Sequence, residues 1–72
     1  MIVSHRPSIK QKILELLKEE FPYDFSIGEI AKQVRVARST ASTWLKVLSA
    51  EGKIEVSRKV GNAIFYRFRD EH

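Results

Sequence analysis

The stretch that decides the fold is "ARSTASTWLKVLSAEG", residues 37–52. Its first half favours a helix less than its second half does. Four of its first eight residues are Ser or Thr, which are mediocre helix formers because their hydroxyls compete for backbone hydrogen bonds. Ala41, Leu45 and Leu48 nevertheless recur at i, i+4 and i+7, the spacing of one buried helical stripe. Gly52 then stands where a helix commonly ends. We expect a helix over about 37–51 whose face opposite the stripe carries small hydroxyl side chains.

A second helix is predicted just before this one, and only a very short turn separates the two helices. Ser26 and Glu29 form an S-x-x-E capping box, and Phe25 and Ile30 occupy the two positions of a hydrophobic staple around it. Apolar residues continue at helical spacing to Val34. The next helix therefore begins within about three residues of the end of this one.

A further helix is predicted near the N-terminus. Ser8 fits an N-cap with Gln11 as its capping-box partner, and apolar residues follow at positions 9, 13, 16 and 17. Phe21 precedes a proline, which disfavours the helical conformation. This helix should run over about 9–20.

After Gly52 the apolar period changes from 3.6 to 2. The segments "KIEVSRK" and "AIFYRFR" alternate apolar and polar residues, and "VGNA" supplies a turn between them. In this β-hairpin Tyr66 and Phe68 should face Val56 and Ile54 in the core, while Phe65 lies on the outward face. The predicted class is α+β, three helices followed by a two-stranded hairpin, with room for a short extra strand before residue 27.

Length and composition predict one small domain over 1–72, with 1–7 as a flexible arm and 70–72 as a tail. The sequence has no cysteine, which excludes disulfides and thiolate metal sites. No apolar run reaches the ~18 residues of a membrane span, and the start "MIVSHRPS" does not resemble a signal peptide. We expect a soluble protein of the cytoplasm.

The charge is distributed unevenly along the chain. Residues 1–34 carry five basic and five acidic side chains, whereas residues 35–69 carry eight basic and two acidic ones. A neutral half followed by a basic half is typical of a surface that binds nucleic acid. The alternative is a solvated face that happens to be basic.

Two helices joined by a tight turn, with the second leading into a hairpin, are the arrangement of a winged helix-turn-helix. The stretch "IGEIAKQVRVARSTASTWLKVLSAEGKIEVSRKVGNAIFYRF", residues 27–68, resembles the winged-helix domain of small prokaryotic and archaeal transcription regulators of the arsenic-repressor and multiple-antibiotic-resistance (ArsR/MarR-like) types. This resemblance implies sequence-specific binding of double-stranded DNA and transcription regulation. The chain departs from the pattern at Arg35, where Gly is usual, and at Ala37, where a Ser or Thr N-cap is usual. The missing cap should cost roughly 1 kcal/mol of helix stability, and Arg35 should adopt a strained turn conformation.

The hydroxyl-rich face of the 37–51 helix is the predicted reading surface. Short side chains let a helix axis approach base edges in a major groove about 12 Å wide. Arg38 has the forked donors that read guanine, and Lys46 is placed to meet a phosphate. The alternative is a solvated helix face with no function. The predicted contacts on this helix are Arg38, Ser39, Ser42, Thr43 and Lys46.

The hairpin supplies the wing, residues 57–63, which should meet the DNA backbone or minor groove. Arg58 and Lys59 flank its turn, and Arg35 and Ser26 add phosphate contacts at the start of the third and second helices. Arg67 and Arg69 either face DNA or keep an edge strand soluble. Trp44 should be a partly buried packing residue. Phe65 could pack on the first helix, join a dimer contact or be exposed.

No catalytic pattern is present, so we expect no enzyme activity, cofactor or metal site. His5 and His72 lie near termini, and cysteine-based metal sensing is impossible. One competing function is a protein-interaction module of a larger replication or transcription assembly, binding an acidic partner. Z-DNA binding is disfavoured because the family pattern of a Pro-rich wing is missing. We expect a homodimer, or a monomer that binds cooperatively, with contacts through the first helix or Phe65; the sequence specifies no small-molecule effector.

Overall fold

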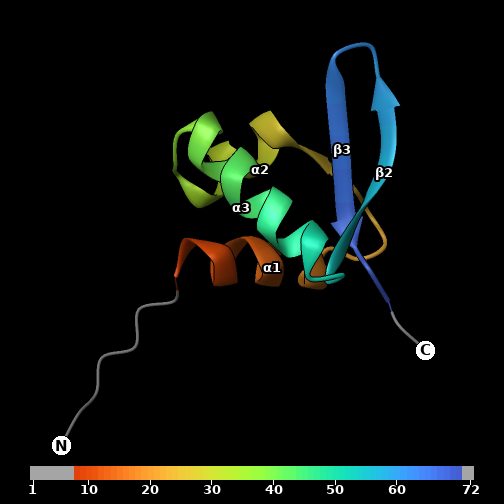
Figure 1. Cartoon of the computed structure of the whole chain (residues 1–72), viewed down its shortest axis with the longest axis horizontal. Coiled ribbons are helices and arrows are strands. Elements are labelled where there is room, and N and C mark those ends of the chain that lie inside the picture. The colour runs from red at the N-terminus through yellow and green to blue at the C-terminus, as the bar shows by residue number, and fades with distance from the viewer. Residues whose placement is uncertain (1–7, 71–72) are drawn as a thin grey trace, which may run out of the picture.

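The computed structural model describes residues 8–70 and has the predicted order of elements (Figure 1). The calls for an arm at 1–7, for His5 and for His72 lie outside these described residues. Three helices gather in one cluster and a hairpin projects beyond them, so the α+β winged-helix prediction is confirmed. The elements are α1 (Ile9–Glu19), β1 (Phe25–Ser26), α2 (Ile27–Val34), α3 (Arg38–Ala50), β2 (Ile54–Val60) and β3 (Ala63–Phe68).

Local sequence signals set the helix ends. The Ser26–Glu29 capping box is complete, since Ser26 N–H donates to Glu29 Oε1 at 2.9 Å and Glu29 N–H donates to Ser26 Oγ at 3.2 Å. At α1, Ser8 Oγ accepts from Gln11 N–H at 3.1 Å, whereas the Gln11 side chain donates to Glu15. The second half of that predicted capping box is therefore wrong. Gly52, with φ of 77°, ends α3 as predicted.

The hairpin belongs to a three-stranded antiparallel sheet in the order β1-β3-β2. The short strand that the sequence allowed before α2 is thus present, and it joins the start of α2 to the hairpin. Ile54 pairs with Phe68 and Val56 with Tyr66, as the alternation predicted. The prediction that Val56 lies in the core is wrong, since it is 53% exposed on β2, an edge strand with no neighbouring strand on its outer side.

The core collects apolar side chains from every helix and from the hairpin. The apolar stripe of α3 is fully buried, and Trp44 packs against the core from a half-buried position, as predicted. In residues 8–70 no helix is both long and apolar enough to cross a bilayer. The buried cluster consists of Ile13, Leu17, Ile30, Leu45, Leu48, Ile54 and Tyr66.

Candidate nucleic-acid interface

The turn between α2 and α3 is made by Arg35, Val36 and Ala37. Arg35 has φ of 59° and ψ of 52°, and it is the one non-glycine residue with positive φ within residues 8–70. Val36 N–H donates to Ala31 O at 3.0 Å, which closes the end of α2 around this left-handed residue. The strained conformation predicted for Arg35 is confirmed, and its side chain is exposed.

The start of α3 has no side-chain cap. Ala37 has the extended backbone of an N-cap, with φ of −65° and ψ of 149°, but makes no capping hydrogen bond. The first backbone N–H groups of α3 therefore depend on water or on a bound anion for partners. Arg38 is the first residue of the helix and is exposed.

The face of α3 opposite the core is exposed at Ser39, Thr43 and Lys46, which follow one another at i, i+4 and i+7. Ser42 lies at the edge of this face and is half-buried. Thr43 Oγ1 donates to Ser39 O at 3.0 Å, a bond within the helix. Thr43 therefore has its methyl group and an acceptor oxygen left for other contacts, whereas the hydroxyl proton is already used.

A β-bulge at Ser57 changes the faces of the two predicted wing cations. Val56 pairs with Tyr66, but the next pair is Arg58 with Phe65, so Ser57 is an extra residue on β2. Cross-strand partners share a face, and successive residues of a strand alternate between faces.

Lys59, paired with Ile64, consequently lies on the face of the sheet that carries the buried Tyr66. Arg58 lies on the opposite, outer face with Phe65. The simple alternation of the sequence would have given the reverse assignment.

Arg58 is engaged within the protein. Its guanidinium carbon lies 4.3 Å from the centre of the Phe65 ring, and its Nε donates to Asp24 Oδ2 at 3.0 Å. A side-chain hydrogen bond from Ser57 and the contact with Arg58 hold the pKa of the Asp24 carboxyl below its ordinary value. Phe65, whose surroundings the sequence left open, thus lies beneath Arg58.

Arg67 and Arg69 lie at the end of the hairpin that is far from the wing turn. Arg67 Nε donates to Glu55 Oε2 at 2.7 Å, on the same outer face as Arg58. Arg69 follows the end of β3 and its N–H donates to Lys53 O at 3.0 Å. These positions favour a role in solubility and strand pairing over a contact with DNA.

Four cations on the predicted reading elements make no ion pair with any side chain of residues 8–70. These four cations lie in the turn between α2 and α3, on α3, and beside the turn of the wing. The ion-paired cations lie on α1, on the sheet and just after the end of α3. Lysines that form no ion pair within residues 8–70 also occur on α1 and α2. The four cations are therefore distinguished from these lysines by their location, not by the lack of an ion pair alone. The four are Arg35, Arg38, Lys46 and Lys59.

Ser26 differs from these residues. Its hydroxyl and backbone N–H are both used in the capping box, and the Glu29 carboxylate stands at the same helix end. A carboxylate there repels a phosphate, so the geometry does not favour Ser26 as a DNA contact.

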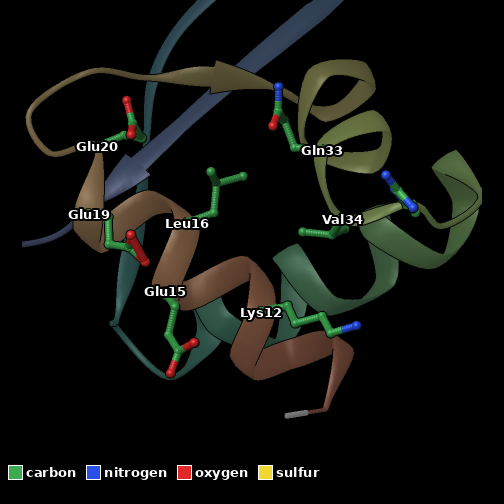
Figure 2. A pocket seen from close by; sticks show the side chains of 8 residues that line it. Lys12, Glu15, Leu16, Glu19, Glu20, Gln33 and Val34 are labelled. Atoms are coloured by element: carbon green, nitrogen blue, oxygen red, sulfur yellow. The ribbon is translucent and has the colours of Figure 1, made fainter. Parts of the chain in front are cut away.

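A hollow of about 380 Å³ lies between α1 and α2, and its chemistry is unsuited to nucleic acid. Figure 2 shows Glu15 and Glu19 projecting from α1, with Gln33 and Val34 across from them on α2. The carboxylates would repel phosphates. Within residues 8–70 no three acidic, His or Cys side chains gather in a way that could hold a metal ion. The hollow is lined by Lys12, Glu15, Leu16, Glu19, Glu20, Gln33, Val34 and Arg35.

The fold and the exposed face of α3 define a winged helix-turn-helix protein. The sequence profile of a family described as "HTH domain" matches residues 10–62, so the chain belongs to this family.

Solved structures share the fold. Reduced HlyU from Vibrio cholerae N16961 superposes with a TM-score of 0.74 at 24% identity, over 88% of this chain and 62% of that one. NolR from Sinorhizobium fredii gives a TM-score of 0.70 at 24% identity, over 86% of this chain and 59% of that one. The chain thus spans about three fifths of the length of these two proteins. No curated protein sequence matches it significantly.

Proposed function

We propose that this chain is a transcription regulator that binds double-stranded DNA in a sequence-dependent way. The observation that carries the proposal is the exposed face of α3, where small hydroxyl side chains lie between Arg38 and Lys46, two cations that form no ion pair within residues 8–70. Membership of the helix-turn-helix family and the wing beside α3 support it. In this proposal α3 enters the major groove and the wing meets the adjacent backbone or minor groove.

The proposed contacts divide into reading and anchoring residues. Arg38 reads guanine O6 and N7, and the Thr43 methyl group packs on a thymine methyl. The short side chains of Ser39 and Ser42 let the backbone of α3 approach the DNA. Their hydroxyls bond base edges or phosphates. Arg35, Lys46 and Lys59 anchor phosphates, in addition to the uncapped N–H groups of α3.

The proposed role is the binding of DNA and not catalysis. The proposed location of the protein is the cytoplasm, together with the DNA that it binds. We also propose that two copies share one DNA site, because one small module buries only about 600–1,000 Å² on DNA. Phe65 lies beneath Arg58, and we therefore propose α1 rather than Phe65 as the contact between copies.

The test begins with fluorescence anisotropy of random 20–30-base-pair duplexes titrated at several salt concentrations, followed by selection of a preferred sequence. We expect Arg38→Ala to weaken binding to that sequence by about 1–3 kcal/mol and to flatten the preference. Lys59→Ala should weaken all duplexes equally and lower the salt slope by about 0.9.

Lys18→Ala is the matched control, since Lys18 is an exposed cation of α1 without an ion pair in residues 8–70, and its removal should leave both quantities unchanged. If Arg38→Ala behaves as Lys59→Ala does, α3 is not the reading helix. If the unmodified protein binds no duplex even at low salt, the proposed function is wrong and the basic face belongs to a protein partner.

A further inference from the structure

Asp24 and Arg58 form an ion pair that crosses the outer face of the sheet. Asp24 immediately precedes β1, and Arg58 lies on β2, with β3 between those two strands. The Arg58 side chain passes over the Phe65 ring on β3, 4.3 Å from its centre, to reach the carboxylate at 3.0 Å. The Asp24 side chain is 19% exposed and that of Arg58 is 57% exposed, so the carboxylate is shielded from solvent and the guanidinium is less so.

This arrangement removes one cation from the wing. Arg58 follows the bulge and neighbours Lys59, yet a carboxylate balances its charge and an aromatic ring covers one face of its guanidinium. Lys59 has neither kind of partner in residues 8–70 and lies on the other face of the hairpin. Of two adjacent cations, one is available to a phosphate and one is occupied.

We propose that Asp24 limits the affinity of this protein for DNA of any sequence by holding Arg58 away from the phosphate backbone. The inference rests on the proposed function. Phosphate contacts supply nearly all of the affinity for non-specific DNA. Keeping one such contact from forming lowers binding to every sequence by the same factor, and the preference that α3 gives one sequence over another is unchanged.

The test is Asp24→Asn, which removes the charge and keeps the size and an acceptor for Ser57. Released from the carboxylate, Arg58 becomes available to a phosphate. Affinity for random duplex DNA at low salt should therefore rise, and the salt slope should steepen by about 0.9, the value for one additional phosphate contact. The preference for the selected sequence over random DNA should stay the same, because a phosphate contact carries no sequence information.

Arg58→Ala distinguishes this role from a general effect of charge. Alone it leaves the Asp24 carboxylate without its partner, and that carboxylate repels phosphates. The double variant Asp24→Asn/Arg58→Ala removes both charges, so its duplex affinity and salt slope should equal those of the unmodified protein and the gain produced by Asp24→Asn should vanish. Glu55→Gln is the matched control. It frees Arg67, which lies on the same outer face as Arg58 but at the end of the hairpin that is far from the wing turn, so the salt slope should not steepen.

Thermal unfolding verifies that each variant is folded, and the double variant carries the test if Asp24→Asn does not fold. The proposal is overturned if the double variant binds as weakly as Lys59→Ala, since Arg58 then already contacts DNA in the unmodified protein. It is also overturned if folded Asp24→Asn binds random DNA as the unmodified protein does. Either result leaves the proposed function intact, which fails only if the unmodified protein shows no salt-dependent duplex binding.

Discussion

At the scale of single residues, Arg35 is the position where stability and the proposed function conflict. A side chain in the left-handed region costs roughly 1–2 kcal/mol relative to glycine. Arg35 has that conformation at the turn that leads into α3. Strain of this kind persists where the surrounding structure imposes it, and it gathers at functional sites.

We therefore expect Arg35→Gly to raise the free energy of unfolding by about 1 kcal/mol and to weaken duplex binding. Urea unfolding measures the first quantity and anisotropy the second. Arg35→Lys is the control, because it keeps both the strain and the charge and should change neither quantity much. Undiminished DNA binding by Arg35→Gly would remove Arg35 from the proposed contacts.

At the scale of the element, α3 lacks the cap that its backbone is shaped to receive. Ala37 already has N-cap dihedral angles, so a hydroxyl at this position could accept a bond from a first-turn N–H without any backbone change. Ala37→Ser should raise the free energy of unfolding by about 1 kcal/mol. Ala37→Val keeps the position uncapped and should give no such gain in the same urea titration.

The elements themselves were predictable because their signals are local. The Ser26–Glu29 capping box, Gly52 and the change of apolar period each lie within a few residues of the boundary that they mark. The bulge at Ser57 was not predictable, because alternation in a sequence does not reveal an unpaired residue.

The ion pair that Arg58 forms could not be predicted either, since its carboxylate partner is 34 residues away in the chain. The exposed face of α3 followed from periodicity, but the hydrogen bond from Thr43 to Ser39 did not.

At the scale of the whole molecule, two carboxylates connect segments that are far apart in the chain. Asp24 binds Arg58 across the sheet, and Glu51 at the end of α3 accepts from Lys10 of α1 at 2.6 Å. A side-chain hydrogen bond from Ser57, together with Arg58, lowers the pKa of Asp24 from its ordinary value of 3.8, and Lys10, with a further contribution from Lys53, lowers the pKa of Glu51 from 4.5.

Since the folded-state pKa values are depressed, the stability that these groups contribute is fully present above their ordinary pKa values. It is lost as the pH falls through the folded-state values. Urea midpoints measured from pH 7 to pH 2.5 should accordingly decline below about pH 4.5. The double variant Asp24→Asn/Glu51→Gln should show a shallower decline. An equal decline in both proteins would assign the acid sensitivity to other groups.

The bulge at Ser57 also bears on how wings of this kind can change over time. A bulge takes up one residue of β2 without changing the pairs on either side of it, so Arg58 stays opposite Phe65 and Lys59 stays opposite Ile64. Loss of the single codon for Ser57 would join these pairs to Val56–Tyr66 in a regular ladder and leave each cation on its present face. Gain or loss of one residue at this position could thus occur in evolution without changing which of the two cations shares a face with Tyr66.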